Sequence, residues 1–161
     1  MTICWVTGAD GQVGRSLRQQ VEEQNNRNYL FLSRADLDIT DNNAIKDMAL
    51  KNPPECIINL AAFTDVNGAE DNPEAAHMVN ATAVKHLASL AEKNNAVLIQ
   101  ISTDYVFDGT KTSPYLETDT TSPLNVYGKS KLQGEKYAQN ICSKHLIIRT
   151  SWIFRNSVKT L

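Results

Sequence analysis

The sequence predicts an α/β fold in which helices cover both faces of a doubly wound parallel sheet. Short apolar runs alternate with helical patterns along the 161 residues, as expected for repeated strand–helix–strand units. The runs CIINLAA and VLIQIST are apolar at most positions rather than at every second one, which is typical of strands buried on both faces. A turn with three glycines follows the first run directly. Together these observations predict ligand binding at the carboxyl ends of the strands.

Each element follows from a local pattern. Apolar runs bounded by polar or turn-forming residues predict five strands: Thr2–Thr7, Tyr29–Leu32, Cys56–Leu60, Val97–Ser102 and His145–Arg149. Four helices are expected between them: Val13–Glu23, Asn42–Lys51, Glu74–Lys93 and Asn125–Asn140. The third helix has one apolar stripe, formed by Val79, Ala83, Leu87, Leu90 and Ala91. The stretch from Asp104 to Pro123 is expected to be irregular and, at that length, functional or mobile.

Composition and charge indicate one globular domain. The net charge is -2 and 42% of the residues are hydrophobic, so we expect no nucleic-acid partner. No run approaches the roughly 20 apolar residues that span a bilayer, and no signal-peptide pattern opens the chain. We therefore expect a cytoplasmic protein without a membrane partner, and leave a homo-oligomer open. The cysteines and histidines are scattered, so no metal site is predicted.

The segment TGADGQVG spaces Gly8, Gly11 and Gly14 three residues apart, where a helix is expected to begin. The first glycine permits a tight turn, the second lets a pyrophosphate approach the backbone, and the third lets the helix pack near the strand. Free N–H groups at the helix N-terminus favour an anion. The alternative is a plain glycine-rich turn. The order of strand, turn and helix favours dinucleotide binding in a Rossmann-type fold.

The end of the second strand bears on which dinucleotide binds. Sites that prefer NAD usually carry an acidic residue there, whereas this strand runs into Ser33 and Arg34. A hydroxyl and a guanidinium suit a 2′-phosphate, so NADPH is favoured over NADH, although Arg34 could be a solvated surface charge. Asp38 and Ile39 could flank the adenine, or Asp38 could cap the helix that begins near Asp41.

Small and polar side chains follow the third and fourth strands. Ala61 and Ala62 would let the backbone lie against a cofactor, with Thr64 as a hydroxyl donor, although the alanines could equally serve packing. ISTDYVFDG supplies three polar side chains where such sheets bind ligands: Ser102, Thr103 and Asp104. Polar groups at that point are costly unless they meet something polar. We therefore expect a ligand there.

The segment LNVYGKSK places Tyr127 and Lys131 four residues apart, on one face of the fourth helix. Alone, the pair could be a half-buried aromatic residue and a solvated charge. With the glycine turn and a hydroxyl after the fourth strand, it resembles the short-chain dehydrogenase/reductase family. STDYVFDGTK, PYLETDTTSPLNVYGKSKLQGEK and IIRTSWIF narrow the resemblance to dTDP-4-dehydrorhamnose reductases, an extended branch of that family.

The resemblance implies reduction of a 4-keto nucleotide sugar to dTDP-L-rhamnose by hydride from NADPH or NADH. Tyr127 then matches the general acid, Lys131 the partner that favours the ionised phenol and holds the nicotinamide ribose, and Thr103 the hydroxyl that steadies the carbonyl oxygen. A phenol titrates near pH ~10, so a neighbouring ammonium should bring the pKa of Tyr127 closer to neutrality. Asp104 and Trp152 match substrate contacts, although Trp152 could be a core residue. The implied cofactor positions are Gly8, Gly11, Gln12, Val13, Gly14, Ser33, Arg34, Asp38, Ile39, Ala61, Ala62, Phe63 and Thr64.

Two other functions stay open. The non-catalytic regulatory beta subunit of methionine adenosyltransferase has a similar YGKxKLxGEK block, and nucleotide-sugar epimerases and dehydratases belong to the same superfamily. STDYVFDG and RTSWIF favour the reductase. Chains of the reductase family continue into two further strands and a smaller substrate domain. We therefore expect residues 1–161 to form a single Rossmann cofactor-binding domain, truncated after its fifth strand, which is left as a sheet edge.

Overall fold

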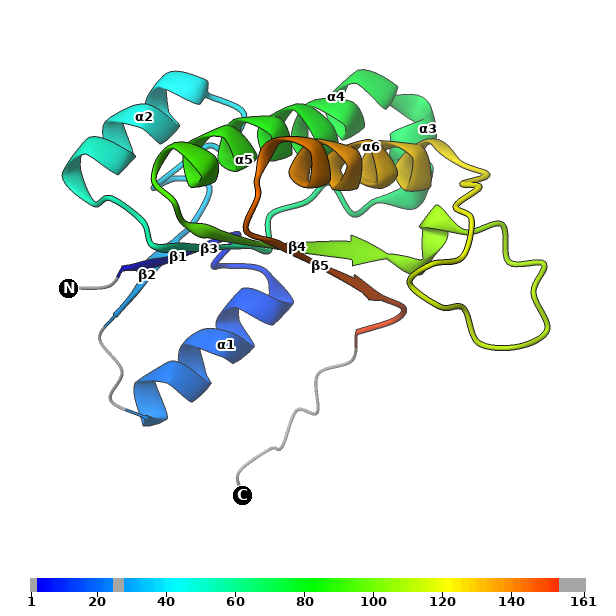
Figure 1. Ribbon diagram of the computed structural model, residues 1–161, viewed down its shortest axis with the longest axis horizontal. Helices are drawn as coiled ribbons and strands as arrows, with labels where there is room; N and C mark the ends of the chain where they lie inside the picture. Colours follow the sequence, from blue (N-terminus) through cyan, green and yellow to red (C-terminus); the bar gives the residue numbers. More distant parts are fainter. Residues whose placement is uncertain (1–2, 25–27, 154–161) are drawn as a thin grey trace.

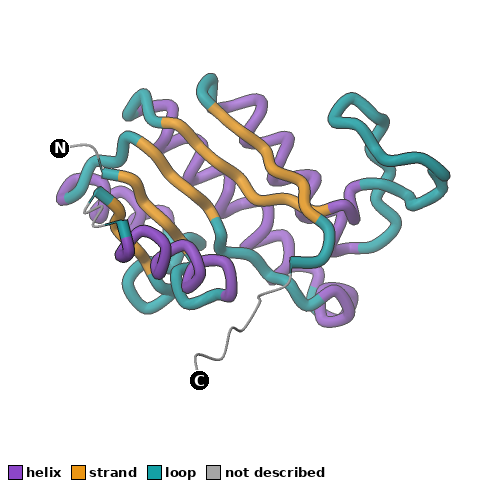
Figure 2. Tube along the Cα trace, turned by 90° about the horizontal axis from the view of Figure 1, so that it is seen from below, coloured by secondary structure: helices purple, strands orange, loops and turns teal. Residues whose placement is uncertain are grey.

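The computed structural model describes residues 3–24 and 28–153, and their strands form one five-stranded parallel sheet (Figures 1 and 2). The strands are β1 (Cys4–Thr7), β2 (Tyr29–Leu32), β3 (Cys56–Asn59), β4 (Val97–Thr103) and β5 (His145–Thr150). Their order is β2-β1-β3-β4-β5, and every pairing is parallel. The five predicted strands and the doubly wound α/β class are confirmed. Thr2, at the start of the first predicted strand, lies outside the described residues.

The helices cover the two faces unequally. α1 (Gln12–Glu23) lies on one face, and α2 (Asn42–Lys51), α5 (Ala83–Lys93) and α6 (Val126–Ile141) lie on the other (Figure 1). β5 is at the edge of the sheet, as predicted, and its Leu146 and Ile148 are exposed. The sequence left open whether Asp38 flanks the adenine or caps α2. The Asp41 carboxylate caps α2 instead, because it accepts from the N–H groups of Asn43 and Ala44.

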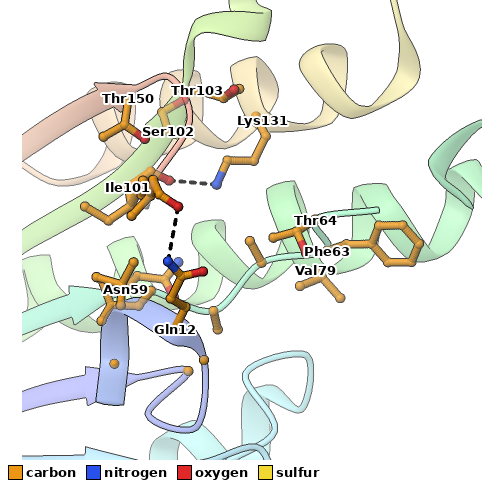
Figure 3. A pocket seen from close by; sticks show the side chains of 18 of the residues that line it. Gln12, Asn59, Phe63, Thr64, Val79, Ile101, Ser102, Thr103, Lys131 and Thr150 are labelled. Carbon is orange, nitrogen blue, oxygen red and sulfur yellow. Dashed lines mark hydrogen bonds between the residues drawn. The ribbon is translucent and has the colours of Figure 1, made fainter. Parts of the chain in front are cut away.

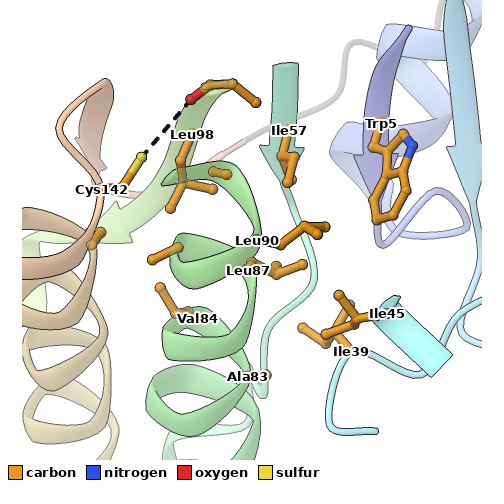
Figure 4. Close-up of a cluster of buried hydrophobic side chains, with 14 of the residues drawn as sticks. Trp5, Ile39, Ile45, Ile57, Ala83, Val84, Leu87, Leu90, Leu98 and Cys142 are labelled. Atoms are coloured by element: carbon orange, nitrogen blue, oxygen red, sulfur yellow. Dashed lines mark hydrogen bonds between the residues drawn. The ribbon is translucent and has the colours of Figure 1, made fainter. Parts of the chain in front are cut away.

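Two rows of side chains run across the sheet on the face that α5 covers. The register places Trp5 beside Ile57 and Ile57 beside Leu98, and this apolar row is fully buried against α5 residues such as Leu87 (Figure 4). Burying each large apolar side chain contributes about 1.5–3 kcal/mol. The next row, two residues nearer the carboxyl ends, is equally buried but polar: Thr7, Asn59 and Gln100.

The region between β3 and β4 differs from the prediction. The helix expected over Glu74–Lys93 begins one residue earlier and contains a π-helical segment, in the order α4 (Pro73–His77), η1 (Met78–Thr82) and α5. A short helix precedes it, α3 (Val66–Asp71), which the sequence did not predict. Its sequence, VNGAED, has no apolar periodicity, and only Ala69 is buried. The Asp65 carboxylate, which accepts from the Gly68 N–H, defines its start.

The stretch from Asp104 to Pro123 is irregular, as predicted, and carries its own internal contacts. It opens with the 3-10 turn η2 (Asp104–Val106). The rings of Phe107 and Tyr115 stack with centroids 4.1 Å apart. The Tyr115 hydroxyl donates to Asp108 at 3.0 Å, and Lys111 forms an ion pair with Asp119 at 2.5 Å. These contacts tie together the part of the segment that follows η2, which contains no helix or strand.

Candidate functional site

A cleft of about 800 Å³ opens at the carboxyl ends of β1, β3 and β4. β1 lies between β2 and β3, so the connection from β1 to β2 runs to one side of β1 and the later strands lie on its other side. Open α/β sheets bind their ligands at such topological switch points. The cleft brings together Val79 of η1 and six stretches of chain, which lie within residues 8–14, 34–40, 59–66, 101–105, 127–131 and 150–153. The fold thus collects the predicted motifs around one space.

Every predicted cofactor, catalytic and substrate residue except Ser33 lines this cleft. The Ser33 hydroxyl donates to the Asp36 carboxylate at 2.6 Å, so it is engaged within its own turn. Trp152 is 78% exposed at the cleft, which rules out the alternative of a core tryptophan. The Gln12 side-chain amide reaches across the cleft and donates to the Ile153 carbonyl at 3.1 Å (Figure 3).

The glycine turn has a shape that side chains would block. Gly8 has a φ of +67°, and a Cβ there would lie 2.6 Å from the Ala61 backbone nitrogen. A Cβ at Gly14 would lie 2.6 Å from the Gly8 carbonyl oxygen. Gly11 is the N-cap of α1 and supplies no side-chain acceptor, so the first N–H groups of that helix are available to an anion. This backbone fits the pyrophosphate of a dinucleotide.

Arg34 and Asp38 lie on the β2 side of the cleft. The Arg34 side chain is 86% exposed, and its Nε is 3.5 Å from the Asp38 carboxylate. That carboxylate also accepts from the Thr40 hydroxyl and backbone N–H, and chiefly for this reason the pKa of Asp38 lies below its usual value. The exposed guanidinium is positioned to meet an anion at the mouth of the cleft.

Three predicted catalytic residues meet where β4 and α6 converge. Thr103 ends β4 and is buried, Tyr127 lies in the first turn of α6, and Lys131 follows one turn later. The Thr103 hydroxyl donates to the Asp104 carboxylate at 3.1 Å and lies near the Tyr127 phenol. The Tyr105 ring packs edge-on against the Tyr127 ring with centroids 5.6 Å apart. The structure therefore holds the phenol between β4 and the first turn of α6.

The electrostatics of Tyr127 differ from the expectation. The sequence predicted that the Lys131 ammonium would lower the pKa of Tyr127, but that pKa is raised above its ordinary value. Burial is the largest cause, the nearby Thr103 hydroxyl opposes it, and the Asp104 carboxylate and the Tyr105 phenol add to it. Lys131 is not among the groups that shift this pKa, and its Nζ donates instead to the Ile101 carbonyl at 2.7 Å (Figure 3).

Lys131 is itself strongly perturbed. Burial lowers its pKa from 10.5 to about 8, and the negative charge of Glu135, one turn further along α6, partly opposes this shift. Glu135 is 1% exposed and forms a two-pronged ion pair with Arg149 of β5, with N–O distances of 3.0 and 2.7 Å. The Arg149 guanidinium lies over the Phe107 ring, 5.1 Å from its centroid. The lysine therefore sits on a helix that is tied to β5 and to the segment after β4.

The start of α6 is fixed by groups from several elements. The Asn125 side chain accepts from the Gly128 N–H at 2.7 Å, and the Glu70 carboxylate of α3 accepts from the Val126 N–H at 2.8 Å. A side chain at Gly128 would collide with the Tyr105 carbonyl. The unpredicted helix α3 thus helps to place the turn that carries Tyr127.

Asn80 is a buried site residue that the sequence analysis missed. It lies in η1, where its amide exchanges two hydrogen bonds with the Phe63 backbone, at 2.9 and 3.0 Å, and donates to the Ser130 hydroxyl at 3.0 Å. It therefore links the strand-three end of the cleft to α6. The available signal was an amide inside the largely apolar helical run MVNATAV.

In the part of the chain that the structure describes, no group of three or more His, Cys, Asp or Glu could hold a metal ion. Nor does any helix there combine the length and the apolar character that a membrane span needs.

Several known proteins with similar sequences and folds are dTDP-4-dehydrorhamnose reductases. A 42% identical dTDP-4-dehydrorhamnose reductase of Aggregatibacter actinomycetemcomitans aligns over 97% of this chain and 54% of its own length, and a 42% identical Salmonella typhimurium reductase aligns over 96% and 54%. The chain thus spans about half the length of these curated relatives. A Clostridium acetobutylicum dTDP-4-dehydrorhamnose reductase superposes with a TM-score of 0.92 at 37% identity, covering 96% of this chain and 55% of that one.

A Bacillus anthracis dTDP-4-dehydrorhamnose reductase, solved in complex with NADP, superposes with a TM-score of 0.90 at 33% identity, and the shares covered are again 96% and 55%. The RmlD substrate binding domain family matches residues 1–161. With this match over the whole sequence, and with the cleft and its residues in place, the chain belongs to the RmlD substrate binding domain family.

Proposed function

We propose that this chain is the cofactor-binding domain of a dTDP-4-dehydrorhamnose reductase, which reduces the 4-keto group of dTDP-4-dehydrorhamnose and forms dTDP-L-rhamnose. One observation carries the proposal: Thr103, Tyr127 and Lys131 converge in the same cleft that the glycine turn lines. The names of the 42% identical relatives support the substrate, and the NADP complex of the Bacillus anthracis relative supports the cofactor.

The cofactor would be NADPH, lying along the carboxyl edge of the sheet. The Gly8–Gly14 turn and the first N–H groups of α1 would hold its pyrophosphate, and the exposed Arg34 guanidinium would meet its 2′-phosphate. Ala61 and Ala62, which line the cleft after β3, leave room for the cofactor to lie close to the backbone. Bound NADPH supplies the hydride that the carbonyl carbon accepts.

Tyr127 would supply the matching proton. The phenol is protonated at neutral pH, since burial raises its pKa further above neutrality, and it can donate its proton to the ketone oxygen as the carbon receives hydride. Hydride and proton together convert the ketone to an alcohol and leave a phenolate. The Thr103 hydroxyl, which lies near the phenol, would steady the substrate oxygen.

Lys131 would stabilise that phenolate and hold the nicotinamide ribose. One of its three N–H groups is occupied by the Ile101 carbonyl, and its side chain lines the cleft. On the substrate side, the Asp104 carboxylate and the exposed Trp152 indole lie at the same opening and would contact the sugar.

The proposal is tested with the protein expressed from its complete reading frame. NADPH oxidation should depend on dTDP-4-dehydrorhamnose, and Tyr127→Phe should lower turnover by roughly 10²–10⁴-fold, which is the usual contribution of a general acid. Cofactor affinity, followed by NADPH fluorescence, should be largely kept. Tyr137→Phe, three turns further along α6, is the matched control and should retain turnover.

Unchanged turnover in Tyr127→Phe would remove this residue as the acid. Intact NADPH binding without turnover of any 4-keto nucleotide sugar would instead favour the alternative of a non-catalytic regulatory subunit. Turnover of a different nucleotide sugar would keep the chemistry and correct the substrate.

A further inference from the structure

A buried row of polar side chains crosses three neighbouring strands and ends beside the catalytic lysine. Thr7, Asn59 and Gln100 stand side by side in the register of β1, β3 and β4, and each is at most 2% exposed. The Thr7 hydroxyl donates to the Asn59 amide oxygen at 2.6 Å, and the Asn59 amide nitrogen donates to the Gln100 amide oxygen at 2.7 Å. The Gln100 amide nitrogen donates to the Ile101 carbonyl at 2.8 Å.

The Ile101 carbonyl is available to side chains because β3 ends before it. The Val97 N–H donates to the Glu55 carbonyl, which lies on the β3 side of β4. Because alternate residues of a strand direct their backbone groups to the same neighbouring strand, the Ile101 carbonyl also points towards β3. The last residue of β3 in the ladder, Asn59, pairs with Gln100. Beyond Asn59 the chain turns away from β4, and the Leu60 N–H donates to the backbone carbonyl of Thr7 in β1.

Two side chains satisfy this carbonyl in place of a strand. Lys131 Nζ donates to it at 2.7 Å (Figure 3) and Gln100 Nε2 at 2.8 Å, so both lone pairs of the oxygen are in use. The ammonium of the catalytic lysine therefore shares its acceptor with an amide that is anchored to two other strands.

The direction of the row follows from the chemistry of its end. A carbonyl oxygen can only accept, so Gln100 must turn its NH₂ group to Ile101 and its oxygen to Asn59. Asn59 must then present its NH₂ group to Gln100 and its oxygen to Thr7, whose hydroxyl must donate. No amide can reverse without placing two oxygens or two NH₂ groups face to face, so the row is a rigid one-way chain of donors.

We propose that Gln100 is a positioning residue for Lys131 and that Asn59 and Thr7 hold Gln100 in that role. The inference rests on the proposed function, because it concerns the lysine of the same site. The amide takes one lone pair of the shared oxygen and places a partly positive NH₂ group beside the ammonium. It therefore limits how strongly the carbonyl can hold Lys131, whose other N–H groups remain available to ligands in the cleft.

The other titratable groups around Lys131 come from three elements. Tyr127 and Glu135 lie on its own helix, Asp104 follows β4, and Arg149 of β5 pairs with Glu135. Of these, Glu135 raises the pKa of Lys131, against the larger effect of burial. The Gln100 amide is uncharged, so its replacement by an apolar residue tests position and hydrogen bonding rather than net charge.

The test is the titration of Lys131 itself, without substrate or cofactor. The protein carries ¹³C-labelled lysine, and the Lys131 signal is assigned by its loss in Lys131→Arg. In Gln100→Met, which keeps the length of the side chain but removes the amide, the pKa of Lys131 should rise from about 8. The expected rise is roughly half a unit or more, because the carbonyl is released to the ammonium. The exposed Gln139 of α6 gives the matched control, and Gln139→Met should leave the titration unchanged.

Thr7→Val is the second variant, because it removes the donor at the far end of the row while Gln100 stays in place. It should also raise the pKa of Lys131, by a smaller amount than Gln100→Met does. If Gln100→Met does not fold, the titration of Thr7→Val tests the proposal. A role of the row in stability alone would lower the melting temperature of these variants without moving the titration. An unchanged Lys131 titration in the folded variants overturns the proposal.

A parallel measurement separates this inference from the proposed function. If wild-type protein turns over NADPH, the limb of its pH–rate profile that belongs to the lysine should shift in Gln100→Met in the same direction as the titration. A shifted titration in a protein without reductase activity would keep the positioning role and reject the reductase. An unshifted Lys131 titration in an active reductase would keep the reductase and reject the positioning role of Gln100.

Discussion

Replacing Lys131 by Met is expected to stabilise the folded chain at neutral pH. Burial lowers the pKa of this lysine from 10.5 to about 8. At about 1.36 kcal/mol per pKa unit, folding therefore disfavours the ammonium form by roughly 3 kcal/mol. Loss of its hydrogen bond to Ile101 costs roughly 1.5 kcal/mol, and the Ile101 carbonyl keeps the Gln100 amide. The net gain in the free energy of unfolding at pH 7 should be about 1–2 kcal/mol.

The free energy of unfolding of the wild type should depend on pH through the titration of Lys131. The folded-state pKa lies below the unfolded one, so between about pH 8 and 10.5 the folded chain binds fewer protons than the unfolded chain. Wild-type stability should therefore rise with pH through this window, while the cost of burying the ammonium is fully present below it. In Lys131→Met this rise is lost, so its advantage over wild type should shrink as the pH increases.

Urea unfolding at pH 7 and about pH 9.5 measures both effects. The matched control is Lys129→Met on the exposed side of the same turn, which should change the free energy of unfolding by less than about 0.5 kcal/mol. A Lys131→Met variant less stable than wild type at pH 7 would refute the reasoning. So would a difference from wild type that stays constant between the two pH values.

Three further predictions concern the groups around this lysine and the cofactor. Gly134→Ala should lower the free energy of unfolding by about 1–3 kcal/mol, because its Cβ would collide with the Asn80 carbonyl; an unchanged thermal midpoint would contradict the close approach of α6 and η1. Glu135→Gln should cost roughly 3 kcal/mol in urea unfolding, because it leaves the Arg149 guanidinium without its counter-charge. It should also move the pKa of Lys131 further below about 8 in the lysine titration, and a rise would show that another charge controls the lysine. Arg34→Ala should weaken NADPH binding about tenfold in fluorescence titrations and NADH binding less; equal losses would show that Arg34 does not read the 2′-phosphate.

The sequence by itself determined the architecture and most of the cleft. Parallel strands buried on both faces need nearly continuous apolar runs, and helices packed on them need one apolar stripe, so both patterns are visible without coordinates. The glycine turn is largely local, because Gly11 and Gly14 meet backbone within the β1–turn–α1 unit and only Gly8 also meets the backbone after β3. Strand ends in a parallel sheet share one edge, so Ser102, Thr103 and Asp104 could be predicted to lie near the glycine turn, and the resemblance to short-chain reductases added Tyr127 to that site.

Only the tertiary structure decided how these groups behave chemically. The pKa of Tyr127 rises because burial outweighs its polar neighbours, and Lys131 donates to a carbonyl that is free only because β3 stops one residue earlier. Thr7, Asn59 and Gln100 lie far apart in the sequence and became one hydrogen-bonded row through the register of three strands. Burial and hydrogen-bond partners depend on distances between remote segments, which folding alone sets, whereas periodicity and turn chemistry are carried by neighbours in the chain.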